Sequence, residues 1–359
     1  MDQPAYSRRG LIWGAGLTAA AGATAGIFAA PAVSGQPLAE PAEPWTYVPP
    51  GGSIADSIEK GARAIQLGAG DYPVEEPIVL PHGTQLRGLG HLSQLTAVEE
   101  VPAIILVGAA GPAYGVGIVD LAIDCAETAK VGIDLHIVGR EGNWYGDNDA
   151  VCRLENLWIW GPVNDGVVYR GTDNRSVHSS RVRVRQAGRF GFLIGESESS
   201  TASDCWWIAC EATTIRQTGE SAGFEVRGAN HFFQACKAWY CRDYGFRIRG
   251  TRNKFTGCEA QDTRLHGWSI EWDMNTFVGC TADTAGMWDV GGEPDSADGF
   301  YFADGTGTSI VGCQSFDRGP RGRKEQQRFG FNVPAEMLAQ GRLIGHSGWG
   351  NTRGLVHER

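Results

Sequence analysis

One short pattern recurs nine times along the chain and constrains its fold more than any other feature. Each copy has a glycine, a bulky apolar residue, a residue of any type and a second apolar residue. The copies begin at Gly132, Gly166, Gly191, Gly223, Gly245, Gly267, Gly299, Gly330 and Gly354. Consecutive glycines are 34, 25, 32, 22, 22, 32, 31 and 24 residues apart, so the spacing has a floor of 22 and a variable excess. Such spacing predicts a solenoid whose unit is stacked and whose extra residues form loops at the rim.

The repeating unit consists of strands, because apolar residues alternate with others in F-E-V, F-R-I and W-S-I after the glycines. A second column contains Cys236, Cys258 and Cys280, each with a Phe three residues before it and an Ala two residues after it. Like residues in columns indicate side chains stacked inside a coil, with rungs about 4.8 Å apart. We therefore predict an all-β fold, a single right-handed parallel β-helix from about residue 63 to 358. A leucine-rich repeat has a similar period, but its leucine signature and helical segment are missing.

The front of the domain resembles a known superfamily. Gly68-Ala-Gly-Asp-Tyr-Pro-Val, followed by Pro77-Ile-Val-Leu-Pro-His-Gly-Thr, is similar to the opening of pectin-lyase-like right-handed β-helix proteins. The resemblance covers roughly residues 50–359. It implies the fold and leaves the chemistry open, since this superfamily includes lyases, hydrolases, epimerases, tailspikes and enzymes of other substrates. A short helix within 53–61, with a Ser N-cap and a Gly at its end, is expected to cover the first coil.

Three segments are predicted along the chain. Residues 1–35 resemble a twin-arginine export signal, with Ser7-Arg8-Arg9-Gly10-Leu11-Ile12 followed by an Ala/Gly-rich stretch. Residues 36–50 are a Pro-rich linker, and 51–359 form the β-helix domain. We expect a secreted or cell-envelope protein without stable membrane insertion after signal cleavage, because the stretch is too rich in Gly and Ala for a lipid-spanning anchor.

Cysteines and charge restrict the partners. The nine cysteines are expected to be reduced and buried as small hydrophobic residues, and none has zinc-ligand spacing. The net charge of −10 makes nucleic acid an improbable partner. No cofactor is predicted. Ca²⁺ is the one candidate, with acidic residues that lack diagnostic spacing at Asp283, Asp289, Glu293, Asp295 and Asp298. The sequence sets no oligomeric state.

Tryptophans and cations recur at outward positions of the coils. Eight residues before the repeat glycines lie Trp158, Arg183, Lys237 and Glu259, and six before them lie Trp160, Arg185, Trp239 and Gln261. Trp206 joins the first column if Cys205 is the inward residue of its coil. Indoles beside guanidiniums suit sugar rings that carry carboxylates. An extended apolar ligand, or packing of the 139–150 insertion over these indoles, is the alternative.

A second candidate site lies at the turn before the repeat glycines. Tyr244, His266 and Asp298 precede successive glycines, and Arg242 and Arg264 lie two residues before Tyr244 and His266. His266 is predicted to transfer protons because an ordinary imidazole titrates near neutrality. Tyr244 would be its partner, and Asp298 would orient the imidazole or act as the acid, with Asp283 as a further candidate. The alternative is that turns simply collect polar residues.

Other polar features are interpreted as structural. Glu225 with Arg247 and Arg249 with Glu271 are expected to form ion pairs between coils. The insertions 139–150, 286–297 and 317–328 are expected to be projecting loops, with 317–328 mobile.

Three functions fit these observations. The first is an exported lyase or hydrolase of an acidic or neutral polysaccharide. The second is a polyketide-type cyclase or isomerase with a closed Trp-lined pocket for an elongated small molecule. The third is a glycan-binding protein without activity. Motifs of known enzymes are incomplete: Leu265-His266-Gly267 is faintly similar to polygalacturonases, and Tyr244-Gly245-Phe246 to alginate epimerases, but neither has its acidic partners.

Overall fold

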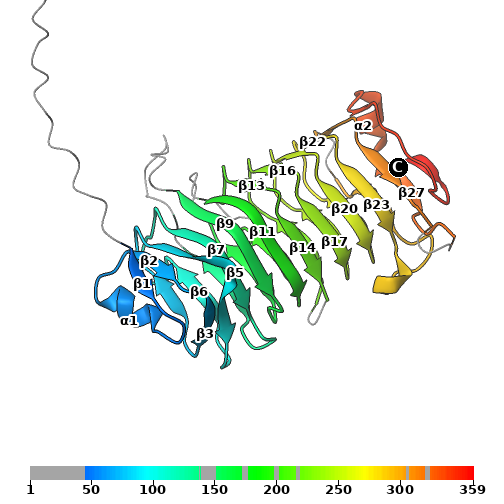
Figure 1. The fold of residues 1–359 in the computed structure, drawn as a ribbon. Coiled ribbons are helices and arrows are strands. Elements are labelled where there is room, and N and C mark those ends of the chain that lie inside the picture. The colour runs from blue at the N-terminus through cyan, green and yellow to red at the C-terminus, as the bar shows by residue number, and fades with distance from the viewer. Residues whose placement is uncertain are drawn as a thin grey trace, which may run out of the picture. The chain divides into compact units, whose positions relative to one another are not determined.

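Parallel strands stack coil upon coil through the part of the chain that the structure describes (Figure 1). The computed structural model describes residues 45–136, 138, 151–171, 177–197, 202–215, 219–304, 307–319 and 324–359. The predicted signal segment 1–35, most of the linker and the 139–150 insertion lie outside these ranges. Every strand pairing within them is parallel, as predicted for a β-helix. No helix in the described ranges is long and apolar enough to cross a membrane.

The repeat glycines lie in one sheet, here called the repeat sheet, or directly beside its strands. Its eleven strands are β4 (Ile78–Leu80), β6 (Ala103–Val107), β8 (Val131–Leu135), β10 (Asp165–Tyr169), β12 (Phe190–Ile194), β15 (Ala222–Val226), β18 (Tyr244–Ile248), β21 (Trp268–Ile270), β24 (Phe300–Phe302), β27 (Phe329–Val333) and β29 (Gly354–Glu358).

The other eighteen strands form one bent sheet with two runs. The long strands β5 (Gln85–Ala97), β7 (Gly117–Asp124), β9 (Cys152–Trp160) and β11 (Val177–Ala187) take part in both runs. The first run also has β1 (Thr46–Val48), β2 (Ala64–Leu67), β13 (Trp206–Ile208), β16 (Phe232–Gln234), β19 (Lys254–Thr256), β22 (Thr276–Val278), β25 (Ser309–Val311) and β28 (Leu343–Ile344). The second run also has β3 (Gly70–Val74), β14 (Glu211–Thr214), β17 (Lys237–Cys241), β20 (Glu259–Thr263), β23 (Thr281–Ala285) and β26 (Gln314–Phe316).

The columns seen in the sequence form the core. Phe224, Phe246, Trp268, Phe300 and Phe331 are fully buried, and each ring stacks on the next. All nine cysteines are buried and free, consistent with their predicted role as small hydrophobic residues. The inward orientation predicted for both columns is therefore confirmed.

The repeat glycines are explained by a close approach across the coil. A Cβ placed on Gly245 would lie 2.7 Å from the Cβ of Ala260 and 2.7 Å from the carbonyl oxygen of Gly267. Atoms in real proteins do not approach this closely. The Gly column and the Ala column are therefore two sides of one contact, in which the repeat sheet packs on the second run.

The ends of the domain differ slightly from expectation. Helix α1 (Ile54–Glu59) lies within the predicted segment, and the Ser53 hydroxyl accepts a hydrogen bond from the Asp56 N–H at 3.0 Å. Strand β1, however, falls inside the predicted linker 36–50 and pairs with β2, so the sheet begins one strand earlier than predicted. A second short helix, α2 (Ala335–Ala339), follows β27 near the C-terminus.

The described residues of the 286–297 and 317–328 insertions contact the coil. The 286–297 segment contains a 3₁₀ turn, η2 (Trp288–Val290), and Asp298 after it stays in register with His266. In the 317–328 segment, the buried Asp317 carboxylate accepts hydrogen bonds from the N–H groups of Gly319 and Gln327. The described residues at both ends of this basic segment are therefore hydrogen-bonded. Residues 320–323 lie outside the described ranges, so the mobility expected for 317–328 stays a prediction.

Candidate functional site

Strands β9, β11, β14, β17, β20 and β23 follow one another along the solenoid (Figure 1). Their outward positions carry the predicted tryptophan and arginine columns. We call this surface the Trp–Arg face. In register along it lie Trp158, Arg183, Glu211, Lys237 and Glu259. A second column contains Trp160 beside Arg185, and farther along Trp239, Gln261, Asp283 and Phe316. Five coil steps separate Trp160 from Asp283, or about 24 Å along the solenoid.

Trp206 is not part of this face, so that prediction is wrong. It pairs with His178 of β11 and Phe232 of β16, which belong to the first run. Cys205 and Cys210 are both buried, but Cys210 is the one that continues the stacked-cysteine column, because Glu211 is in register with Lys237. The sequence could have identified Cys210, because it has an aromatic residue three before it and Ala212 two after it, like the other stacked cysteines.

The arginines of the face are already engaged. Arg183 Nε and Arg185 Nη2 lie 3.2 and 2.7 Å from the two carboxylate oxygens of Glu211. Arg183 also lies over the Trp158 ring, at 5.0 Å from its centroid. Lys237 is paired with Glu259 at 3.1 Å. The face therefore alternates in charge and offers few free cations to an acidic sugar.

A pocket of about 350 Å³ lies at the N-terminal end of the face. Its lining includes His91, Gln94, Asp124, Trp158 and Trp160. His91 meets the edge of Trp158, with ring centroids 4.5 Å apart. The Trp160 side chain is 48% exposed, an unusual position for so large an apolar group. An indole beside amide and carboxylate groups matches the mixed surface of a sugar.

Two buried carboxyls lie toward the other end of the face. Asp262 and Asp283, here called the carboxyl pair, are both held by Arg318, with Nη2 at 3.1 Å from Asp262 and Nε at 2.8 Å from Asp283. Burial raises the pKa of each carboxyl, and the charge of Asp283 raises the pKa of Asp262 further, whereas Arg318 lowers both. Raised carboxyl pKa values are typical of general acids. Asp283 was predicted as a candidate; Asp262 and Arg318 were not.

An aromatic pair lies beyond the carboxyl pair. Phe316 is the register partner of Asp283 on the next coil, and Trp349 stacks on Phe316 at a centroid distance of 4.3 Å and an angle of 4°. Trp349 is 60% exposed. Phe316 has a signal in the sequence that our prediction missed, because it lies three residues after Cys313 as Asp283 lies three after Cys280. Trp349 lies outside the columns and has no such signal.

The predicted turn residues Tyr244, His266 and Asp298 lie close together, but their side chains are packed and paired rather than free for proton transfer. The rings of Tyr244 and His266 are 6.2 Å apart, and the Nδ1 of His266 accepts the Asp298 N–H at 2.9 Å. Burial lowers the pKa of His266 to about 4, which removes the reason for choosing it as a proton carrier at neutral pH. Burial also raises the pKa of the Tyr244 phenol. Tyr301 stacks on the imidazole at 4.4 Å, so the ring is packed as a structural residue.

Asp298 fills a structural position. Its carboxylate is buried and accepts two hydrogen bonds from Arg328, one from the Phe329 N–H and one from Asn332. An Asp165–Arg189 pair repeats this arrangement, with the Phe190 N–H as a further donor. A repeated, fully paired carboxylate holds one coil to the next and is unsuited to act as a free acid.

The two arginines at the turn differ in their ion pairing. Arg264 is paired with the buried Asp243 and with the carbonyl of Arg242. The guanidinium of Arg242 has no ion-pair partner within the described ranges, and it lies near Gly291 of the 286–297 segment. The predicted ladder ion pair between Arg249 and Glu271 is present at 3.1 Å.

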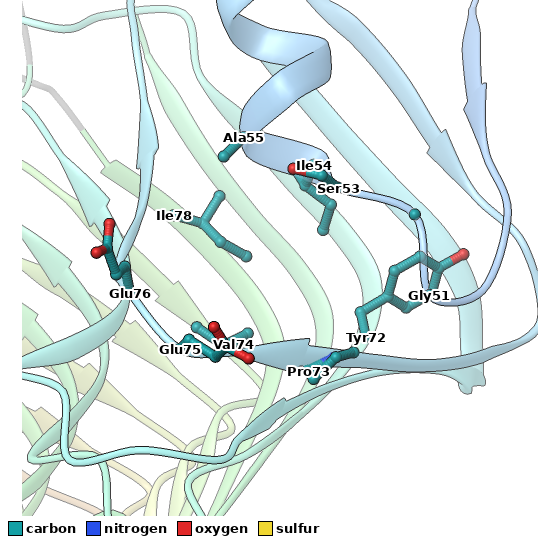
Figure 2. Close-up of a pocket in the computed structure, with 11 residues that line it drawn as sticks. Gly51, Ser53, Ile54, Ala55, Tyr72, Pro73, Val74, Glu75, Glu76 and Ile78 are labelled. Atoms are coloured by element: carbon teal, nitrogen blue, oxygen red, sulfur yellow. The ribbon is translucent and has the colours of Figure 1, made fainter.

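A further pocket, of about 300 Å³, lies at the N-terminal end of the domain (Figure 2). It is formed between α1 and β3, with Tyr72, Glu75 and Glu76 in its lining. Histidine and cysteine are absent from that lining, and within the described ranges no three His, Cys, Asp or Glu side chains are grouped to hold a metal ion. The Trp–Arg face, which combines aromatic surface with titratable carboxyls, is the better candidate.

Comparison with known proteins identifies the fold. A family model described as a right handed beta helix region matches residues 143–315. No curated protein matches the sequence. The chain is similar to the mannuronan C-5 epimerase AlgE4 A-module of Azotobacter vinelandii, with a TM-score of 0.55, 12% identity, and coverage of 85% of this chain and 91% of that one.

Two other solved structures are similar. The catalytic domain of a GH87 α-1,3-glucanase in complex with nigerose gives a TM-score of 0.56, 16% identity, and coverage of 90% of this chain and 67% of that one. The enzymatically active domain of tailspike protein 2 of bacteriophage CBA120 gives a TM-score of 0.59, 12% identity, and coverage of 78% of this chain and 44% of that one. At these identities the likeness establishes the fold alone. The fold is a right-handed parallel β-helix, as predicted.

Proposed function

We propose that this protein is an exported glycoside hydrolase whose polysaccharide substrate lies along the Trp–Arg face. The observation that carries the proposal is the carboxyl pair, Asp262 and Asp283, whose pKa values are raised at the end of an exposed aromatic surface. The three similar structures, an epimerase module, a glucanase with nigerose and a tailspike enzyme domain, support a polysaccharide substrate.

Of the acidic and neutral polysaccharides that the sequence leaves open, the charges of the face favour a neutral one. Arg183 and Arg185 share Glu211, Lys237 pairs with Glu259, and Arg318 holds the carboxyl pair. Four cations therefore meet four acidic groups. A uronate would have to displace one of these carboxylates before a guanidinium bound it.

We propose roles for the two carboxyls from the charge between them. Each accepts a hydrogen bond from Arg318 and one from a neighbour, Gln261 Nε2 at 2.8 Å for Asp262 and the Thr284 hydroxyl at 2.9 Å for Asp283. The charge of Asp283 raises the pKa of Asp262, so Asp262 is assigned as the proton donor to the glycosidic oxygen and Asp283 as the base. The Asp283 carboxylate accepts the proton of the water that attacks the anomeric carbon as the glycosidic bond breaks.

Two alternatives are less well supported. A polyketide-type cyclase needs a closed apolar cavity, whereas Trp160 is 48% exposed on an open face. A binding protein without activity is favoured by one feature, the neutralisation of both carboxyls by Arg318.

The test is incubation with a panel of neutral polysaccharides and polyuronides, followed by assays for reducing ends and for the ultraviolet absorbance of unsaturated products. We expect reducing ends from a neutral polymer, and a loss of about 10²–10⁴-fold in turnover in Asp262→Asn and Asp283→Asn. Glu336→Gln, in helix α2 and outside the Trp–Arg face, is the control and should stay within a few fold of wild type. Unsaturated products would instead indicate a lyase, and binding without cleavage would indicate a binding protein.

A further inference from the structure

Aromatic side chains lie on both sides of the carboxyl pair at equal distances along the solenoid. Trp239 is two coils before Asp283, through Gln261, and Trp349 is two coils after it, through Phe316. Two coil steps correspond to about 10 Å. Trp160 extends the first side farther, whereas Trp349 ends the second side.

The Phe316–Trp349 pair has the properties of a binding platform. Its rings are parallel, with 4.3 Å between centroids, and the carbonyl of Trp349 accepts the Asp317 N–H at 3.0 Å, which fixes the second ring to the coil below. Trp349 is nevertheless 60% exposed. An aromatic pair that is held in place and exposed to water offers an apolar face on which a sugar ring can stack.

Polar groups lie beside this pair. Gln314 and Ser347 are bridged next to it, and Arg318, whose side chain is 44% exposed, follows Phe316 by two residues. Apolar ring faces next to amide and hydroxyl groups match a neutral sugar, which has apolar ring faces and hydroxyl edges.

We infer that Trp349 and Phe316 form a subsite for the sugar residues beyond the bond that is cut, so that the enzyme binds its polymer on both sides and cleaves it internally. This inference rests on the proposed function, which places the cut bond at Asp262 and Asp283. A site blocked at one end would bind only chain termini, but here aromatic surface continues past the acids.

The test separates binding from cleavage. In the Asp262→Asn background, retardation is measured in native gels that contain dextran, laminarin, pullulan, xyloglucan or galactomannan. Adding Trp349→Ala should weaken binding about ten-fold to the polymer that retards the parent, equivalent to about 1.4 kcal/mol. Trp272→Ala is the matched control, because Trp272 is also an exposed tryptophan, at 45%, but lies on the turn between β21 and β22.

Cleavage by the wild type supplies the second readout. Internal cuts should lower the viscosity of the polymer before many reducing ends appear, and Trp349→Ala should raise KM for long chains more than for short oligosaccharides. Any of three results would overturn the inference. The Trp349 and Trp272 variants could be retarded equally, no gel could retard the parent, or the viscosity could fall only in step with the appearance of reducing ends. Hydrolysis itself would still be judged by the Asp262 and Asp283 variants.

A second copy of the chain is the competing occupant of the exposed ring. Sedimentation would then show an oligomer that Trp349→Ala dissociates, with no change in retardation. That result would also overturn the inference.

Discussion

Asp262 and Asp283 lie on neighbouring coils and share one guanidinium, that of Arg318. The arginine comes from the first residues of the 317–328 segment, so a rim insertion completes a site that the coils alone leave acidic. Burial raises both carboxyl pKa values and Arg318 opposes the rise. The balance between these two effects sets the pH range in which one carboxyl keeps its proton.

Replacing Arg318 should therefore move the pH profile of activity. In Arg318→Gln the opposing charge is lost, both pKa values rise, and the alkaline limb of kcat/KM should shift upward by roughly one pH unit. The profile is measured between pH 3.5 and 8 on the polymer that the wild type cleaves. Arg181→Gln, in an exposed pair with Glu155, is the control. An unchanged limb, or a downward shift, would show that Arg318 does not tune the pair.

His266 should control acid stability rather than turnover. Its folded pKa is lowered to about 4, below the ordinary value near 6.5, so the unfolded chain binds the proton more tightly. The imidazole therefore stabilises the fold fully above pH 6.5, and this contribution is lost as pH falls toward 4. His266→Gln should flatten the decline of unfolding free energy over that window by about 2 kcal/mol.

Urea unfolding at pH 4.0, 5.0, 6.0 and 7.0 measures this effect, with the exposed His82→Gln as the control. Turnover of His266→Gln should stay near that of the wild type. A loss of 10²-fold or more with intact stability would return the imidazole to the list of catalytic groups.

The proposed export route predicts the redox state of the cysteines, because twin-arginine export follows folding. We propose that Arg8 and Arg9 direct the folded chain through the twin-arginine route, so that the cysteines are buried before they leave the cytoplasm. All nine are free and buried in the structure. Native exported protein should then react with almost no thiol reagent, and denatured protein should react at nine sites. Lysine at both positions should retain the protein in the cytoplasm, whereas fewer than nine thiols after denaturation would indicate oxidation and a different route.

The periodic part of the molecule could be predicted from the sequence, because every coil must meet the same interior. Cys236, Cys258 and Cys280 recur at the minimum spacing, and their burial follows directly. The position predicted for Trp206 is wrong because Cys205 and Cys210 lie five residues apart, and the sequence does not show which of them belongs to the stacked-cysteine column.

The candidate site was harder to predict because it joins residues that do not share a column. Asp262 is offset by one position from Asp283, counted from the stacked cysteine of each coil. Arg318 lies 56 residues beyond Asp262 in an insertion, where periodicity no longer applies. The lowered pKa of His266 also depends on burial by Tyr301 and its neighbours, which a turn position in the sequence does not reveal.

The Gly245–Ala260 contact offers a stability test of the fold itself. Gly245→Ala would place a Cβ 2.7 Å from that of Ala260 and 2.7 Å from the Gly267 carbonyl oxygen, so the strand must shift. We expect a loss of about 2–3 kcal/mol in unfolding free energy, as for other overpacked cores. Adding Ala260→Gly removes the clash with the Ala260 Cβ but leaves the clash with the Gly267 carbonyl oxygen. Gly245→Ala should therefore cost less unfolding free energy in the Ala260→Gly background than in the wild type, but still more than zero. Urea unfolding of the four proteins gives the coupling energy. Additive losses would mean that the two columns do not touch, and that the Gly and Ala repeats arise independently.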